Sequence, residues 1–237
     1  MRYIQKEITP PQFFIDDTIE LKEQLKNAIV KDKKKVWDNE YKNKRVLKKY
    51  LLESEQNWLC GYCEAKLKET FDREEREKKD LIHIEHIKPK HLDSDNLTFD
   101  YYNLLVSCSG KCFTDKNQPL TCGHKKGDKF DEVLFLDPTK IKDIREYFIY
   151  TNEGYIGASS KNKERAIYTM KLLELDIFNN QLHEARQIAL EEFRESISKH
   201  IQKTKIPKYK IIKKLLDKEN LAFISFLRFR HKNILEK

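Results

Sequence analysis

Hydrophobic residues recur at helical spacing in the first quarter of the chain. Residues 1–16 show no regular pattern and contain a Pro-Pro pair, which prevents an early helix there. Asp17 is a good N-cap for a helix over about residues 17–32. A second helical pattern covers about residues 35–57. The polar face of this helix is basic, with Lys42, Lys44, Arg45, Lys48 and Lys49. Such a face is typical of a solvated helix or, alternatively, of a stripe that contacts phosphates.

The middle of the chain changes character several times. Residues 68–80 are almost all charged, which predicts a solvated loop or a short helix. Residues 81–87 (LIHIEHI) alternate well enough for a β-strand, and Pro89 ends it. Residues 108–124 are rich in Ser, Gly, Lys, Asn, Pro and Thr and predict a long loop. Structureless loops of this length are usually functional or disordered.

After residue 127 the pattern indicates a second set of elements. Residues 133–136 are a short apolar strand candidate, and residues 147–156 resemble a β-hairpin with a Gly turn. Helical spacing follows over about residues 163–192, with an interruption at the Asn-Asn pair 179–180. The tail, residues 199–237, is basic and ends in an apolar segment that we expect to pack in the core. A partner-binding helix is the alternative interpretation of that segment.

Composition favours, without requiring, a polyanionic partner. Charged residues make up 36% of the chain and hydrophobic residues 39%, and 47 basic against 39 acidic residues give a net charge of +8. That excess suits nucleic acid, although lysines that merely solvate helices would give the same number. The chain has no run of 18 apolar residues and no secretory signal pattern at its start, so we expect a cytoplasmic protein without a membrane span.

All five cysteines lie within 63 consecutive residues, which in a cytoplasmic protein favours a metal site over disulfides. Cys60 and Cys63 have the two-residue gap of a zinc knuckle, in which both thiolates can reach one ion. Cys108 and Cys122 complete a four-cysteine site, with Cys112 as the alternative fourth ligand. Buried free thiols are the competing interpretation. Four protein ligands leave no position for water, so this zinc would be structural and hydrolysis would need a second metal.

A carboxylate and an imidazole are neighbours at Glu85 and His86, at the end of the predicted strand. A carboxylate suits Mg²⁺ or Mn²⁺, and a neutral imidazole can take a proton from water. Hydrolysis of a phosphodiester needs both functions. Strand alternation would direct the two side chains to opposite faces, so we expect the strand to bend near Pro89. Such a pair alone is more often incidental than catalytic, but its position between the cysteine pairs favours a site.

The motifs CGYC, IEHIKP, YYNLLVSC and CGHKKGD follow one another in the order of the HNH nuclease pattern, which this chain resembles. The resemblance implies that Glu85 binds the catalytic metal and that His86 is the general base. It also implies that the side-chain amide of Asn103 orients this base. A further metal ligand belongs after the last knuckle cysteine.

For that further ligand we choose His124, with Asp128 as the alternative, because Gly123 occupies the position that the family usually gives to the ligand. The family often keeps a Lys at the position of Lys126. The side chains that we expect to contact nucleic-acid phosphates are Lys88, Lys125 and Lys126.

Other segments are similar to the PtuB nuclease subunit of Septu anti-phage systems. They are the long insertion between Cys108 and Cys122, FLDPTKI, FIYTNEGYI and LLELDIFNNQLHEAR, and they extend the likeness over roughly residues 58–187. In such systems the nuclease works beside an SMC/ABC-type ATPase, PtuA, and some members accompany retrons. The resemblance implies a PtuA-like partner that holds the nuclease in check. The chain has no Gly-rich phosphate loop, so ATP chemistry would belong to that partner.

These inferences predict an α+β fold with a ββα-metal (HNH, treble-clef-like) core and a structural zinc knuckle. Residues 1–57 would form an N-terminal helical segment, residues 58–160 the nuclease core with a small hairpin, and residues 161–237 a C-terminal helical segment, all in one compact unit. DNA is the favoured substrate. The alternatives are a stand-alone restriction-type HNH endonuclease, a nuclease that cuts RNA or tRNA, and a non-catalytic zinc module that binds nucleic acid or protein.

Other histidines have less specific settings. His83 lies two residues before Glu85, on the same face of an ideal strand, and could hydrogen-bond to the metal ligands without binding the metal itself. His91 could approach the cleft. The remaining three are expected to be ordinary surface or core residues, namely His183, His200 and His231.

Overall fold

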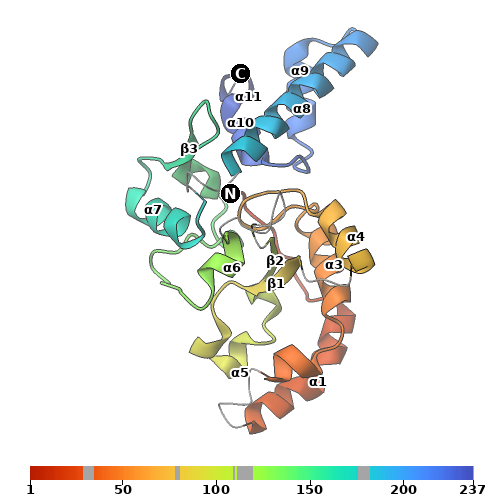
Figure 1. Cartoon of the computed structure of the whole chain (residues 1–237), viewed down its shortest axis with the longest axis vertical. Helices are drawn as coiled ribbons and strands as arrows, with labels where there is room; N and C mark the ends of the chain where they lie inside the picture. The colour runs from red at the N-terminus through yellow and green to blue at the C-terminus, as the bar shows by residue number, and fades with distance from the viewer. Residues whose placement is uncertain (29–34, 78–80, 109, 111–119, 176–181, 237) are drawn as a thin grey trace.

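Helices and two small antiparallel sheets make up the described part of the chain, which confirms the α+β class (Figure 1). The computed structural model describes residues 1–28, 35–77, 81–108, 110, 120–175 and 182–236. The first half contains α1 (Gln12–Asn27), a π-helix (Val36–Glu40), α3 (Lys44–Ser54), α4 (Lys68–Glu77), β1 (Ile82–His86), a 3-10 helix (Lys90–Leu92), α5 (Ser94–Leu97), a 3-10 helix (Tyr101–Asn103) and β2 (Leu104–Cys108). The second half contains α6 (Cys122–Lys126), a 3-10 helix (Ile144–Tyr147), β3 (Phe148–Tyr150), β4 (Ile156–Ala158), α7 (Lys163–Leu172), α8 (Leu182–Lys203), α9 (Lys208–Leu216), α10 (Ile224–Arg230) and α11 (Lys232–Leu235).

The sheet of β1 and β2 lies at the centre of the chain's first half. The strands pair antiparallel in a register that joins Ile82 to Cys108 and His86 to Leu104. The expected strand over residues 81–87 is confirmed to within one residue at each end. All five residues of β2 are buried, and both α3 and α6 pack against this sheet. The two strands therefore place the residues of the IEH motif beside α6.

The N-terminal helices differ from the sequence expectation. Helix α1 begins at Gln12, directly after Pro11, because a proline can precede the first turn of a helix although it disrupts a helix interior. The expected irregular segment is therefore confirmed for residues 1–11 and wrong for residues 12–16. The single helix expected over residues 35–57 is divided into the π-helix and α3, with extended backbone at Tyr41. The Tyr41 ring packs on the Trp37 ring with centroids 5.4 Å apart, which fixes this break.

The region after α6 contains the expected hairpin and lacks one expected strand. Strands β3 and β4 pair antiparallel, and the turn between them contains Gly154 at a φ of 88°, a value that glycine adopts without strain. The strand expected over residues 133–136 is wrong. The Asp131 carboxylate accepts hydrogen bonds from the backbone N–H groups of Val133 and Leu134, each at 2.9 Å, and thereby forms a turn.

The apolar segment near the C-terminus packs in the core, as expected. Helix α10 buries Ile224, Phe226 and Leu227 and contacts β3, α8 and α9. Glu64, next to Cys63 in the chain, accepts hydrogen bonds from both the backbone N–H (2.8 Å) and the hydroxyl (2.5 Å) of Ser225. This link joins the C-terminal helices to the knuckle.

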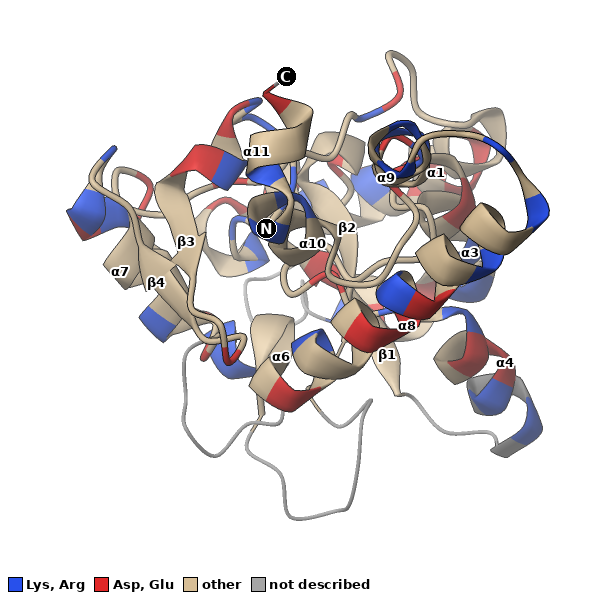
Figure 2. Cartoon of the chain, turned by 90° about the horizontal axis from the view of Figure 1, so that it is seen from above, with Lys and Arg blue, Asp and Glu red and all other residues tan. Residues whose placement is uncertain are grey.

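Charged residues of both signs are spread over most helices (Figure 2). None of the helices in the described ranges combines the length and the apolar character that crossing a bilayer requires. The interruption expected at residues 179–180, between α7 and α8, lies outside the described residues.

Candidate functional site

Four thiols converge between the knuckle, the end of β2 and the start of α6. Cys60, Cys63, Cys108 and Cys122 are buried, and their Sγ atoms all lie within 4.8 Å of one another. Cys108 Sγ lies 3.6 Å from Sγ of Cys63 and 3.6 Å from Sγ of Cys122. Four thiolates at ~2.3 Å from one tetrahedral ion would be ~3.8 Å apart, so this spacing suits a single metal ion. The alternative fourth ligand, Cys112, lies outside the described residues.

All four of these thiols would ionise only with a cation among them. Burial raises the pKa of the Cys63 and Cys122 thiols well above the usual value. Burial opposes the Cys60 thiolate too, but hydrogen bonds with the other three thiols outweigh it and hold the Cys60 pKa well below the usual value. Four buried thiolates therefore need a positive charge at their centre. The group could hold a metal ion, and four thiolates are a donor set that zinc prefers.

The knuckle packs directly on β2. The N–H group of Cys60 donates to the Ala65 carbonyl at 2.8 Å, which closes the turn. The N–H group of Gly61 donates to the Val106 carbonyl at 3.0 Å. A Cβ atom at Gly61 would lie 2.9 Å from Leu105 Cδ1, so a glycine allows this close approach. The sequence CGYC thus brings two thiols to the end of β2, where the third one lies.

Glu85 is buried on the face of β1 that α6 covers. Its Oε1 lies 2.9 Å from Lys126 Nζ and accepts a 3.4 Å hydrogen bond from the Tyr62 hydroxyl, and its Oε2 lies 3.1 Å from His83 Nε2. Only 7% of Glu85 and 1% of Lys126 is exposed. Burial would raise the pKa of Glu85, but the His83 hydrogen bond and the Lys126 ammonium outweigh it and hold the pKa below the usual value. The carboxylate is therefore ionised at neutral pH.

Gly123 brings the start of α6 against the Glu85 side chain. A Cβ atom there would lie 2.6 Å from both Glu85 Oε2 and His83 Nε2. The His124 ring stands edge-on to the His83 ring, with centroids 4.0 Å apart, whereas Asp128 is exposed just beyond α6. The buried Nδ1 atom of His83 has no hydrogen-bond partner in the described part of the chain. His83 therefore contacts both predicted ligands, Glu85 and His124, which is closer than we expected. The sequence signal for its position was strand alternation, which puts His83 on the same face as Glu85.

His86 faces away from Glu85, because β1 stays regularly paired through its last residue. The chain does bend near Pro89, at Ile87 and Lys88, but this bend follows the strand and does not bring Glu85 and His86 to one face. The His86 ring packs against Trp37 with centroids 4.6 Å apart, and its Nε2 lies 3.0 Å from the Thr98 carbonyl oxygen. Because a carbonyl can only accept, Nε2 carries the proton and Nδ1 holds the lone pair. Burial lowers the pKa of His86 to about 4, so the ring is neutral at pH 7.

Asn103 braces the segment between β1 and β2 rather than the His86 ring itself. Its Oδ1 accepts from the N–H group of Lys88 at 2.8 Å, and its Nδ2 donates to the carbonyls of Lys88 at 2.9 Å and Leu97 at 3.4 Å. Leu97 directly precedes Thr98, whose carbonyl holds His86. The direct contact predicted between Asn103 and the imidazole is thus replaced by an indirect one through the backbone.

The three lysines predicted to contact phosphates have different surroundings. Lys88 Nζ lies 3.1 Å from Glu132, and Lys125 Nζ lies 2.6 Å from Glu174. Ion pairs near the surface contribute little and can be exchanged for other partners, so the roles of Lys88 and Lys125 stay predictions. Lys126 would have to leave the buried ion pair described above to reach a phosphate. Its position favours a structural role.

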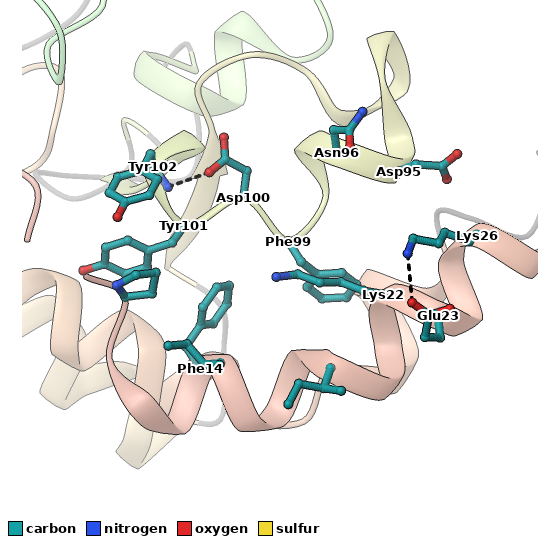
Figure 3. A pocket seen from close by; sticks show the side chains of 13 residues that line it. Phe14, Lys22, Glu23, Lys26, Asp95, Asn96, Phe99, Asp100, Tyr101 and Tyr102 are labelled. Atoms are coloured by element: carbon teal, nitrogen blue, oxygen red, sulfur yellow. Dashed lines mark hydrogen bonds and ion pairs between the residues drawn. The ribbon is translucent and has the colours of Figure 1, made fainter. Parts of the chain in front are cut away.

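A hollow of about 540 Å³ lies between α1 and the segment that precedes β2 (Figure 3). Figure 3 shows Phe14 and Phe99 along this hollow and the Lys26–Glu23 ion pair at one end. Among the described residues that line it there are carboxylates, including Asp95 and Asp100, but no His or Cys. The hollow therefore lacks an imidazole that could accept a proton, and the candidate site lies at β1 and α6 instead.

Comparison with known proteins adds no assignment. Neither the scan against protein-family models nor the search of curated proteins finds a match. Two features of the site therefore carry the functional argument. The first is the four-thiol group that could hold a metal ion, and the second is an ionised carboxylate at Glu85 that is followed in the chain by a neutral imidazole at His86.

Proposed function

We propose that this chain is a metal-dependent endonuclease of the HNH type that hydrolyses phosphodiester bonds, with DNA as the favoured substrate. In this proposal β1, β2 and α6 form the ββα-metal core. The observation that supports it most is that two consecutive residues at the end of β1, which face opposite sides of the strand, have the required protonation states: an ionised carboxylate at Glu85 and a neutral imidazole at His86. The first suits a divalent cation and the second can accept a proton, and phosphodiester hydrolysis needs both.

Zinc in the four-thiolate group would have a structural role. Four protein ligands fill a tetrahedral shell, so no position remains for water or substrate. The thiols come from the knuckle, the end of β2 and the start of α6, and one ion would fix these three parts together. Because Gly123 follows Cys122 directly, the same joint would hold the Gly123 backbone against Glu85 and His83.

Glu85 and His124 would hold the catalytic cation, with the imidazole of His83 next to both and Asp128 as the alternative ligand. The donor chemistry fits a cation, because the Glu85 carboxylate is ionised and a neutral imidazole is a common metal ligand. Imidazole ligands favour Mn²⁺ over Mg²⁺, which prefers oxygen ligands. When bound, the ion would offset negative charge on the phosphate.

His86 would accept the proton of the attacking water at Nδ1. The Thr98 carbonyl engages Nε2, which fixes the tautomer, and the Trp37 ring supports the imidazole from the side. Asn103 positions the segment that carries Thr98. The low pKa keeps the imidazole neutral at physiological pH, so His86 needs no prior deprotonation, although a base with a pKa near 7 would be stronger.

The resemblance to PtuB-like subunits supports a wider part of the proposal, namely action in anti-phage defence beside an SMC/ABC-type ATPase. A second candidate function is a non-catalytic zinc module that binds nucleic acid or protein. One observation favours it: Lys126 already neutralises Glu85 inside the protein, which gives the carboxylate a structural use. A nuclease assay separates the two candidates.

In this assay the zinc-loaded chain, alone and with any ATPase encoded beside it, is incubated with plasmid DNA, linear duplex, single-stranded DNA and tRNA. Mn²⁺, Mg²⁺ or neither is added. We expect cutting only with an added cation, and a loss of about 10²- to 10⁴-fold in His86→Ala. His183→Ala, at a partly exposed histidine at the start of α8, is the matched control and should cut like the wild type. Unchanged cutting by His86→Ala would remove His86 as the base, and a lack of cutting under every condition would favour the zinc module.

A further inference from the structure

We infer that a lysine-rich arm binds the phosphate backbone of double-stranded DNA. We define the arm as residues 196–216, which include the end of α8 and all of α9. The arm contains seven lysines and no acidic residue. Because the whole chain has a net charge of +8, the other 216 residues together carry only +1. The inference rests on the proposed function for its choice of DNA.

The charges of the arm are available to a partner. Lys213 is partly buried, and the exposed lysines are Lys199, Lys203, Lys205, Lys208, Lys210 and Lys214. Lys199 Nζ lies 3.6 Å from Glu195 on the same helix, where both side chains are about 70% exposed. In the described ranges, no acidic side chain lies within 4.0 Å of the other six ammonium groups. The arm is therefore an uncompensated basic surface rather than part of an ion-pair network.

The arm lies far from the candidate site. Helix α8 begins beside the hairpin of β3 and β4, where Arg186 Nη1 donates to the Gly154 carbonyl at 2.8 Å. Its 22 residues span about 33 Å, and the last eight of them, residues 196–203, belong to the arm. Figure 1 shows α8 and α9 extending away from β1, β2 and α6, and Figure 2 shows basic residues prevailing on α9. A distance of this order corresponds to about 10 base pairs of duplex.

Three observations favour a duplex backbone over other anionic partners. All seven basic side chains are Lys, whereas protein interfaces are depleted in Lys and enriched in Arg. Helix α9 also lacks the free apolar face that inserts into a membrane surface, because its four aliphatic residues are buried, namely Ile211, Ile212, Leu215 and Leu216. The exposed aliphatic residues of the arm are Ile201 and Ile206, which lie outside α9. Tyr209 is the arm's one aromatic residue, which is few for stacking on unpaired bases.

The test compares two triple variants with the same change in net charge. The arm variant carries Lys205→Gln, Lys208→Gln and Lys210→Gln. The matched control carries three substitutions at exposed lysines elsewhere, namely Lys142→Gln, Lys163→Gln and Lys171→Gln. Both are made in the His86→Ala chain, so that binding of a 30-base-pair duplex is measured without cutting. Fluorescence anisotropy between about 50 and 200 mM salt gives the Kd and its salt dependence.

We expect the arm variant to raise the Kd at least ~10-fold and to reduce the slope of log K against log salt by up to about 3. The control should change the Kd by about 2-fold at most. Equal losses in both variants would show that only total charge matters, and this result, like an unchanged Kd in the arm variant, would overturn the inference. Circular dichroism checks that each variant is folded.

A competition experiment tests the other class of partner, an acidic protein surface. If poly-L-glutamate displaces the duplex as well as unlabelled DNA does at equal charge, the arm binds acidic polypeptide and the inference is overturned. Duplex RNA that binds through the arm more tightly than DNA would also overturn it. A chain that binds DNA through the arm but never cuts it would contradict the proposed function and leave this inference intact.

Discussion

Lys126 Nζ lies 2.9 Å from Glu85 Oε1, and this ion pair joins α6 to β1 inside the protein. The two side chains are 1% and 8% exposed, and the Lys126 ammonium also donates to the His86 carbonyl at 3.2 Å. A charge buried in this way is tolerated only when its counter-ion is present. The position of α6 on the sheet therefore depends on a charge balance as well as on the thiol group.

Lys126→Met is expected to lower the free energy of unfolding by about 3–5 kcal/mol, because Glu85 would stay buried without its counter-ion. Adding Glu85→Gln to the same chain should restore a large part of this loss, since a neutral amide needs no counter-ion. Urea unfolding of the wild type, both single variants and the double variant forms a double-mutant cycle. Simple additivity of the two losses would contradict the ion pair.

Gly123→Ala should damage the site, because its Cβ atom would lie 2.6 Å from both Glu85 Oε2 and His83 Nε2. We expect a loss of about 1–3 kcal/mol in the free energy of unfolding, as for other overpacked positions. Any nuclease activity should fall at least ~10-fold, since a misplaced group costs this much or more. Gly157→Ala is the matched control, because its Cβ atom would meet only the Ile149 side chain, at 3.3 Å. Similar behaviour of the two variants would contradict a special role for Gly123.

The parts of the site that the sequence predicts are those with short-range spacing rules. A two-residue gap lets Cys60 and Cys63 reach one ion, and strand alternation puts His83 and Glu85 on one face. The structure brings these cysteines together with Cys108 and Cys122, as the four-cysteine prediction requires. The hairpin of β3 and β4 was also predictable from local sequence, because a Gly-containing turn between two short apolar segments favours a β-hairpin.

The parts that could not be predicted depend on distant contacts or on the backbone. The acceptor for His86 is the carbonyl of Thr98, and any residue type offers a carbonyl. The sequence shows that Lys126 is basic, but only the packing of α6 on β1 makes it a buried partner of Glu85. A family position suggested a phosphate contact for it instead. The expected bend near Pro89 occurs only after His86, because pairing with β2 continues through that residue, so it does not bring Glu85 and His86 to one face.

Removal of the metal from the four-thiol group should destabilise the whole chain, because the group joins three segments. We expect one zinc per chain by elemental analysis. Cys63→Ser should lose the metal and lower the Tm by about 10 °C or more, as expected for a loss of several kcal/mol. Cys112→Ser is the matched control and should keep both the metal and the Tm. Loss of zinc from that control would show that Cys112 is a ligand.

His86 should make stability depend on pH in a defined window. Its pKa in the folded protein is about 4, below the usual value of 6.5 that we expect in the unfolded chain. Between these values the unfolded chain takes up a proton that the folded chain does not, so stability falls as the pH falls from 6.5 to 4. Above pH 6.5 both forms are neutral and the full stability is present. The loss is at most about 3 kcal/mol, since one pKa unit corresponds to ~1.4 kcal/mol and the ring is partly exposed.

The measurement is urea unfolding at pH 7.0, 5.5 and 4.5, without added divalent cation, of the wild type, His86→Gln and the control His200→Gln. Other groups contribute to the pH dependence in all three chains, so the difference between chains isolates His86. His86→Gln should lose less stability on acidification than the wild type, because glutamine takes up no proton. His200→Gln should follow the wild type, since His200 is exposed. If all three chains lose the same stability between pH 7.0 and 4.5, the folded protein does not lower the pKa of His86. That result would contradict the argument that His86 is a neutral base at physiological pH.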